Sequence, residues 1–249
     1  MSATVSIHPA SLAGRTALIS GAASGLGASL ARSLGEAGAT IVGVDIQARR
    51  LLDGMALLRE RGIDARGVTA DLADPREAAR AVDLALDGQG RLDILVNNAG
   101  TDLTLPIDEL SDSDWQRVIG TNLGAPFVLS RQAALHMRRQ GGGHIVNIAS
   151  TAAKRAWPNA SAYHASKWGL LGLSHALHAE LRPHGIRVTA VVAGGMRTPF
   201  LLERFPELDP DSLQDPDDVA EAIRSVLLLP ASAVVAEMTI LPLHETSWP

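Results

Sequence analysis

Short apolar runs alternate with amphipathic stretches along most of the chain. The apolar runs, rich in aliphatic and β-branched residues, lie at 16–20, 41–45, 65–69, 92–96, 145–149, 186–192 and 238–241. Apolar residues recur at helical spacing over 26–37, 47–61, 112–139, 161–181 and 217–229. A further helix is expected after Asp74, which can cap it, and Pro75, which suits its first turn. This regular alternation of strands and helices predicts a parallel sheet with helices on both faces.

The strand at 186–192 reads IRVTAVV and is almost uniformly apolar, as a sheet covered on both faces requires. The chain of 249 residues shows no linker, repeat or low-complexity stretch. We therefore predict an α/β fold in which residues 1–249 form a single domain. Its core would be a doubly wound, Rossmann-type parallel sheet of about seven strands.

Two segments depart from this pattern. Residues 193–215, rich in Pro, Leu and Phe, lie between a strand and the next helix, and a long loop in this position is often a lid over a substrate. The alternative is a loop that only packs on the surface. The last residues, 242–249, are expected to form a C-terminal tail, in which Trp248 either packs on another subunit or is frayed.

Composition excludes several classes of function. The chain has 22 basic and 27 acidic residues and no basic run, so we expect no nucleic-acid partner. It has no Cys, no apolar run of about 18 residues and no recognisable signal peptide, which predicts a cytoplasmic protein without a membrane span. His175 and His178 are three residues apart but have no evident carboxylate partner, so no metal site is expected.

A glycine-rich turn follows the first strand, in the sequence SGAASGLG at 20–27. Such a turn between a strand and a helix lets backbone N–H groups approach a pyrophosphate at the positive end of the helix. The spacing differs from the GxGxxG pattern but fits the same role. The residues expected at the cofactor are Gly21, Ser24, Gly25, Leu26 and Gly27.

Asp45 ends the second strand, eighteen residues after Gly27. An acidic residue about 20 positions on binds the ribose hydroxyls of NAD, and it would repel the 2′-phosphate of NADP. We therefore predict NAD (NADH), with NADP less favoured. Arg49 and Arg50 follow closely and could soften this preference, and a helix-capping role for Asp45 is the alternative.

Tyr163 and Lys167 are four residues apart, which places them on one face of the expected helix. A neighbouring ammonium group would lower the pKa of the phenol toward neutral pH, where general acid–base catalysis is efficient. Ser150 follows the fifth strand, at the edge of the sheet where such folds place their chemistry. A Tyr-x-x-x-Lys pair alone is common by chance, so the other motifs must support it.

With these motifs in order, the chain resembles the short-chain dehydrogenase/reductase family over about residues 14–229. The glycine turn resembles the family's cofactor turn, with Ser20 in place of Thr, and NNAG at 97–100 resembles its signature after the fourth strand. The matches to the family's catalytic tetrad are Asn122, Ser150, Tyr163 and Lys167.

The resemblance implies a role for each of these residues. Tyr163 would be the general acid or base, Lys167 would lower its pKa and bind the nicotinamide ribose, and Ser150 would bind the substrate oxygen. Asn122 would support a water chain from Lys167 to solvent. Thr198 would bind the carboxamide, in a segment where Ala193 replaces the usual Pro. The further residues implied at the cofactor are Asp71, Leu72, Asn98, Ala99, Gly100 and Gly194.

The substrate is predicted less closely. Family positions imply a mostly apolar lining, which favours a medium-sized, partly hydrophobic alcohol or ketone. A homodimer or homotetramer is also implied. Two alternatives stay open, namely an NADPH-dependent 3-oxoacyl-thioester reductase and a catalytically silent NAD(H)-binding sensor. The implied lining residues are Asp102, Leu103, Thr151, Ala152, Trp157, Met196, Phe200, Leu201, Leu202 and Phe205.

Overall fold

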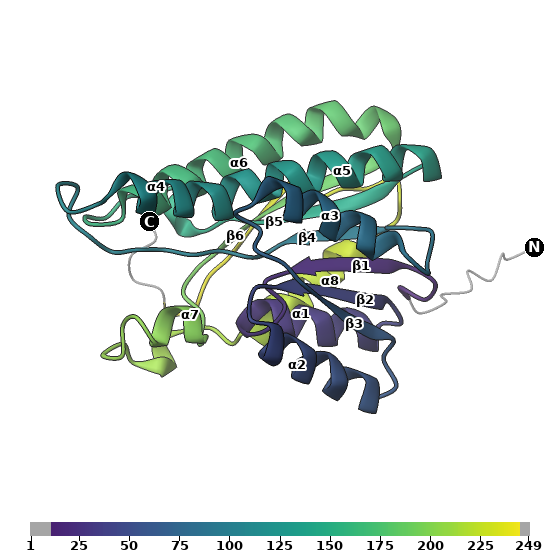
Figure 1. Ribbon diagram of the computed structural model, residues 1–249, viewed down its shortest axis with the longest axis horizontal. Helices are drawn as coiled ribbons and strands as arrows, with labels where there is room; N and C mark the ends of the chain where they lie inside the picture. The colour runs from purple at the N-terminus through teal and green to yellow at the C-terminus, as the bar shows by residue number, and fades with distance from the viewer. Residues whose placement is uncertain (1–10, 245–249) are drawn as a thin grey trace, which may run out of the picture.

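The computed structural model describes residues 11–244, which form one seven-stranded parallel sheet between two layers of helices (Figure 1). The strand order is β3-β2-β1-β4-β5-β6-β7, and every pairing is parallel. The strands are β1 (Thr16–Ser20), β2 (Thr40–Asp45), β3 (Ala65–Thr69), β4 (Ile94–Asn97), β5 (Gly143–Ile148), β6 (Ile186–Ala193) and β7 (Glu237–Ile240). The predicted doubly wound Rossmann-type fold is confirmed.

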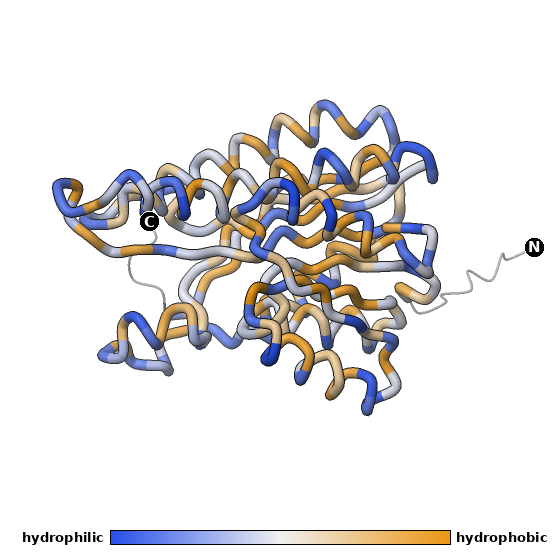
Figure 2. The backbone as a smooth tube through the Cα atoms, viewed as in Figure 1, coloured by the Kyte–Doolittle hydropathy of each residue, from blue (hydrophilic) through white to orange (hydrophobic). Residues whose placement is uncertain are grey.

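The helices pack as two layers. One face of the sheet carries α1 (Gly25–Glu36), α2 (Ala48–Glu60) and α8 (Pro216–Leu227), and the other carries α3 (Pro75–Leu86), α4 (Asp112–Ile119), α5 (Ala125–Gln140) and α6 (Ser161–Leu181) (Figure 1). Each layer closes its own apolar core against the strands. Figure 2 shows the strands largely hydrophobic and the outer helix turns hydrophilic, as burial of both sheet faces requires.

The chain reverses its direction of winding between β1 and β4. From β1 it proceeds outward through β2 to β3, and from β4 it proceeds the other way to β7. The loops that follow β1 and β4 therefore separate at the carboxyl edge of the sheet. This switch point is where open α/β sheets bind their ligands.

The helix predicted over 112–139 is interrupted. A π-helical turn, Gly120–Gly124, separates α4 from α5, and the N–H of Ala125 bonds to the carbonyl of Gly120. The turn lies inside one unbroken helical run from Asp112 to Gln140, and the periodicity of apolar residues did not predict it. π-helical turns occur frequently at functional sites, and this one carries Asn122.

The predicted irregular segment 193–215 contains two short helical pieces, α7 (Pro199–Leu202) and a 3₁₀ turn at Pro210–Ser212. Its two ends are held together by a bridge between Met196 and Gln214 and by an ion pair of 2.7 Å between Arg197 and Asp215. The segment therefore forms a loop whose two ends meet, beside the carboxyl edge of the sheet (Figure 1). Of the predicted tail, residues 245–249, including Trp248, lie outside the described residues.

Candidate active site

The glycine turn after β1 is shaped by close backbone contacts. Gly21 has φ 68° and Gly25 has φ 53°, conformations that favour glycine. A Cβ on Gly27 would lie 2.0 Å from the carbonyl oxygen of Gly21, and a Cβ on Gly21 would lie 2.9 Å from Ala99 Cα. Helix α1 begins at Gly25 without a side-chain cap and without an acidic residue in its first turn. Its first N–H groups are therefore suited to a phosphate.

Hydrogen bonds join this turn to the loop after β4. Ser20 Oγ accepts from the backbone N–H groups of Asn98, at 2.9 Å, and Ala99, at 3.0 Å. The Asn98 amide donates to the carbonyl oxygens of Ser20, at 2.9 Å, and Gly21, at 3.2 Å. The two predicted cofactor motifs, distant in sequence, thus form one rigid edge at the switch point.

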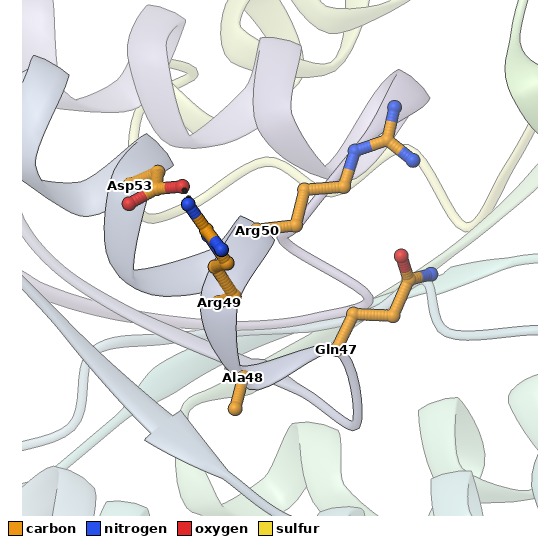
Figure 3. Close-up of a pocket in the computed structure, with 5 residues that line it drawn as sticks. All are labelled: Gln47, Ala48, Arg49, Arg50 and Asp53. Carbon is orange, nitrogen blue, oxygen red and sulfur yellow. Dashed lines mark ion pairs between the residues drawn. The ribbon is translucent and has the colours of Figure 1, made fainter.

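Asp45 lies at the end of β2 and is 9% exposed. Its carboxylate accepts from the N–H of Ala23, at 3.0 Å, and from the N–H of Gln47, at 2.9 Å. It therefore holds the glycine turn and the chain after β2 in place. The start of α2 borders an adjacent surface pocket, where Arg49 points toward Asp53 and Arg50 points away (Figure 3).

The remaining residues expected at the cofactor are spread along the same edge. Leu72 is 6% exposed and belongs to the core, so only its backbone is available to a nucleotide, whereas Asp71 is exposed. Thr198 is 6% exposed and packs against the turn, since a Cβ on Gly25 would lie 3.1 Å from Thr198 Cβ. Gly194 donates its N–H to Ile240, at 2.8 Å.

Tyr163 and Lys167 lie together on α6, with Lys167 Nζ 5.6 Å from the centre of the Tyr163 ring. Burial raises the pKa of Tyr163 to about 12, although a hydrogen bond with Ser150 acts in the opposite direction. Burial also lowers the pKa of Lys167 to about 8. Lys167 Nζ donates to the carbonyl of Ile148, at 2.8 Å. The pKa of the phenol is therefore raised and not lowered as expected, because desolvation outweighs the hydrogen bond with Ser150 and the charge of Arg204.

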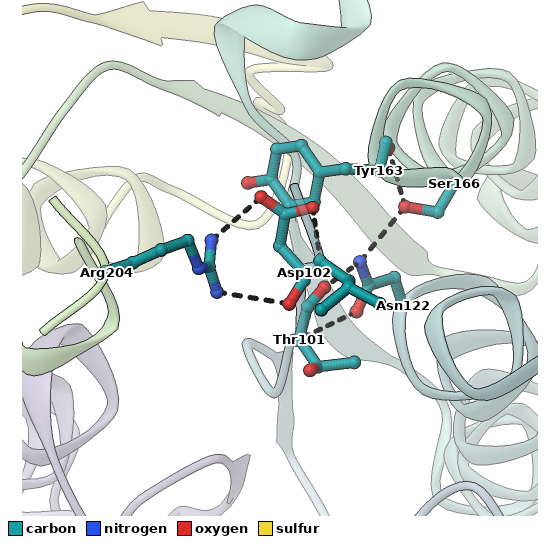
Figure 4. Close-up of polar contacts among 7 residues, drawn as sticks. Thr101, Asp102, Asn122, Tyr163, Ser166 and Arg204 are labelled. Carbon is teal, nitrogen blue, oxygen red and sulfur yellow. Dashed lines mark hydrogen bonds and ion pairs between the residues drawn. The ribbon is translucent and has the colours of Figure 1, made fainter. Parts of the chain in front are cut away.

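Asn122 is fully buried in the π-helical turn, and both the oxygen and the nitrogen of its side-chain amide form hydrogen bonds (Figure 4). Its Oδ1 accepts from the N–H of Thr101, at 2.8 Å, and its Nδ2 donates to the carbonyl of Thr101, at 2.8 Å, and to Ser166 Oγ, at 3.0 Å. Ser166 in turn donates to the carbonyl of Tyr163, at 2.7 Å. Asn122 thus ties the loop after β4 to the helix that carries Tyr163.

The loop from Ser150 to Trp157 is held by His164, which was not singled out in the sequence. His164 Nε2 accepts from the N–H of Trp157, at 3.1 Å, so Nδ1 carries the proton and donates to Ala152, at 2.9 Å. The Trp157 ring packs edge-on against His164, at 4.2 Å between centroids. Ser150 Oγ accepts from the N–H of Ala152, at 3.1 Å, which orients the hydroxyl.

The segment 193–215 lies against the same site. The ring of Phe200 is 6.3 Å from that of Tyr163, and Arg204 Cζ lies 4.5 Å above the Phe200 ring. Arg204 also forms an ion pair of 2.8 Å with Asp102, which lies far from it in the sequence. Arg204 carries no local sequence signal and was missed. Six further expected lining residues are partly exposed or buried, namely Leu103, Thr151, Met196, Leu201, Leu202 and Phe205.

No helix within residues 11–244 is long and apolar enough to cross a membrane. Within the same part of the chain, no group of three or more His, Asp or Glu side chains is placed to hold a metal ion.

Comparison with known proteins gives a consistent result. A family model described as short chain dehydrogenase matches residues 15–209. The D-threitol dehydrogenase of Mycolicibacterium smegmatis is 40% identical over 183 residues, which cover 72% of this chain and 69% of that protein. A subunit of the (2S)-[(R)-hydroxy(phenyl)methyl]succinyl-CoA dehydrogenase of Thauera aromatica is 35% identical over 223 residues, covering 84% of this chain and 87% of that one.

Solved structures are similar over nearly the whole chain. A metagenomic short-chain oxidoreductase in complex with NADP is 32% identical and superimposes with a TM-score of 0.83, covering 93% of this chain and 98% of that chain. A variant of the actinorhodin polyketide ketoreductase with NADPH is 32% identical, with a TM-score of 0.85 over 92% of this chain and 97% of that chain.

Proposed function

This chain belongs to the short-chain dehydrogenase/reductase family, and on that premise we propose that it transfers hydride between NAD(H) and a secondary alcohol or its ketone, with Tyr163 as general acid or base. At the coarser level, it is an NAD(P)-dependent oxidoreductase acting on an alcohol or ketone. The observation that carries the finer proposal is the half-buried Tyr163, which is hydrogen-bonded to Ser150 and lies beside Lys167.

The glycine turn fits a dinucleotide. A Cβ on Gly21, Gly25 or Gly27 would lie within 3.1 Å of neighbouring protein atoms, so the tight turn requires glycine at these positions. The start of α1 presents N–H groups for phosphate. Asn98, Ala99 and Thr198 border the same edge, and Asp45 would contact the ribose of the adenosine. When bound, the cofactor supplies or accepts the hydride.

The residues of the chain would handle the proton and the oxygen. At neutral pH a phenol whose pKa is raised to about 12 is protonated, which is the form that donates to a carbonyl oxygen during reduction. Ser150 would donate a hydrogen bond to the same oxygen as negative charge develops, a contribution of about 10²–10³-fold in rate. Lys167, held by the Ile148 carbonyl, would stabilise the phenolate that results. Asn122 would hold the loop after β4 in place.

The test of the reaction uses a panel of ketones, 3-oxoacyl thioesters and sugars with NADH and NADPH, each followed by loss of reduced-nicotinamide absorbance. We expect NADH-dependent reduction of ketones to secondary alcohols. Reduction confined to 3-oxoacyl thioesters with NADPH would instead identify a thioester reductase. Tight NADH binding with no turnover of any substrate would identify a sensor.

We propose that NAD is preferred because Asp45 carries a charge where NADP would place its 2′-phosphate. The similar structures named above hold NADP or NADPH, which makes this preference worth a direct test. We expect tighter binding of NADH than of NADPH in the wild type, measured by titration of nucleotide fluorescence. The Asp45→Ala variant should lose part of this preference. Tighter NADPH binding in the wild type, weakened by Arg50→Ala, would contradict the proposal.

We also propose that the chain forms a homodimer through the helices that carry Asn122 and Tyr163. Large apolar side chains on this layer are exposed, namely Trp115, at 41%, Phe127, at 46%, and Trp168, at 52%. Exposed apolar patches of this kind mark protein interfaces. Light scattering of the purified protein should give twice the chain mass or a multiple of it. A monomer at micromolar concentration would contradict the proposal.

A further inference from the structure

An ion pair joins the loop after β4 to the segment 193–215 beside Tyr163. Arg204 Nη1 donates to Asp102 Oδ2, at 2.8 Å, and Arg204 Nη2 donates to the carbonyl of Asp102, at 3.3 Å. Figure 4 shows the Asp102 carboxylate between the Arg204 guanidinium and the Tyr163 ring. Both charges act on the phenol, since Asp102 raises the pKa of Tyr163 and Arg204 lowers it. The pair therefore lies close to the reacting group.

The burial of this pair is costly. The Asp102 side chain is 8% exposed and that of Arg204 is 24% exposed. Burial raises the pKa of Asp102 despite the opposing effects of Arg204 and the Leu103 N–H. Pairs buried to this degree add little net stability, because desolvation offsets the attraction. By contrast, the ion pair between Arg197 and Asp215 in the same segment is exposed, at 38% and 40%. A role in stability alone does not account for the Asp102–Arg204 pair.

The pair retains unused hydrogen-bonding capacity. Asp102 Oδ1 accepts only from the Leu103 N–H, at 2.7 Å, among the contacts of residues 11–244. A carboxylate has further lone pairs and a guanidinium has further N–H groups. The Arg204 side chain is also braced, since it stacks on Phe200 at 4.5 Å. The two residues thus offer a fixed acceptor and a fixed donor next to each other.

Resting on the proposed function, we propose that Asp102 and Arg204 are specificity-determining residues that bind a hydroxyl group close to the reacting carbon of a neutral hydroxyketone or diol. A hydroxyl group can donate to the carboxylate and accept from the guanidinium at once. The pair has no net charge, and the Asp102 carboxylate would repel an anionic group placed against it. The apolar side chains of Leu103, Phe200 and Leu201 would cover the rest of the substrate.

The test compares ketones that differ only by a hydroxyl or a carboxylate group. Acetoin, butanone and acetoacetate have the same number of carbons, and hydroxycyclohexanone with cyclohexanone gives a larger pair. We expect the wild type to have a higher kcat/KM for each hydroxyketone than for the plain ketone, and the lowest for acetoacetate. The decisive quantity is the ratio of kcat/KM for hydroxyketone to ketone, because effects on Tyr163 act on both substrates and cancel.

Asp102→Asn keeps the shape and removes the charge, and Arg204→Met keeps an apolar stem over Phe200. Each should lower the ratio about 10- to 100-fold, the effect of losing a hydrogen bond to a charged group. Asp215→Asn is the matched control, because it breaks the exposed ion pair with Arg197 while Asn still caps α8. This control should leave the ratio unchanged, and melting temperatures of all variants report whether they are folded.

An equal loss for both substrates in the Asp102 and Arg204 variants would overturn the proposal, because the pair would then only hold the segment 193–215 in place. Faster reduction of plain ketones than of hydroxyketones by the wild type would also overturn it, and would leave the proposed function intact. Failure of the wild type to reduce any ketone with either nucleotide would count against the proposed function itself.

Discussion

Acid should destabilise this protein through His144, a residue of β5 that is 1% exposed. Thr189 Oγ1 donates to the carbonyl of Val235, at 2.7 Å, so His144 Nε2, at 2.8 Å from the same hydroxyl, must be the donor. His144 Nδ1 is buried and has no partner among residues 11–244. Burial, with a smaller effect of Arg187 and Arg15, lowers the pKa of His144 from 6.5 to about 3.

The sign of the effect follows from this lowered pKa. Below pH 6.5 the unfolded chain binds a proton at His144 that the folded chain does not, so stability is lost as the pH falls from 6.5 toward about 3. Each pH unit in this window costs about 1.4 kcal/mol, which gives about 2 kcal/mol at about pH 5. For a chain of this size, that corresponds to a fall in Tm of about 4–8 °C.

The assay is thermal unfolding at about pH 7 and pH 5, at one protein concentration, for the wild type and two variants. His144→Gln retains an N–H donor for Thr189 but cannot be protonated, so it should lose about 2 kcal/mol less than the wild type over this interval. The exposed His184, changed to Gln, is the control and should behave as the wild type. Equal pH dependence in the wild type and His144→Gln would refute the reasoning.

Two further predictions concern the glycine turn and Lys167. Gly27→Ala should abolish measurable NADH binding, because its Cβ would lie 2.0 Å from a backbone oxygen. The control is Gly54→Ala, whose Cβ would meet no atom within 4 Å, and this variant should bind NADH normally in the same titration. Since burial lowers the pKa of Lys167 from 10.5 to about 8, its charge is lost as the pH rises through about 8, and kcat/KM for the nucleotide should fall there. A profile that stays flat to about pH 10 would contradict a role for the charged Lys167.

The pattern of apolar and polar residues was sufficient to predict the sheet and the edge on which the candidate site lies. Apolar runs identified the strands. The glycine turn and Asn98 directly follow a strand, and Ser150 lies two residues after the end of β5. In a parallel sheet the carboxyl ends of the strands share one edge, so residues far apart in sequence were expected to converge there. The structure brings Ser20, Asn98 and Gly21 together in this way.

Features set by tertiary packing could not be predicted. The π-helical turn around Asn122 lies inside one unbroken helical run from Asp112 to Gln140, so apolar residues at helical spacing did not distinguish it from α-helix. The pKa values of Tyr163 and Lys167 depend on how deeply both side chains are buried, which residue spacing does not reveal. The partner of Asp102 lies 102 residues away in an irregular segment, where no periodicity predicts the position of Arg204.

The central claim is that Tyr163 transfers the proton, and ketone reduction by Tyr163→Phe tests it most directly. The variant keeps the ring against Phe200 and Lys167 and removes only the hydroxyl. With a ketone that the wild type reduces, we expect kcat to fall by at least about 10²–10⁴-fold, while the Kd for NADH changes little. Turnover at the wild-type rate by a variant that still binds NADH would contradict the account.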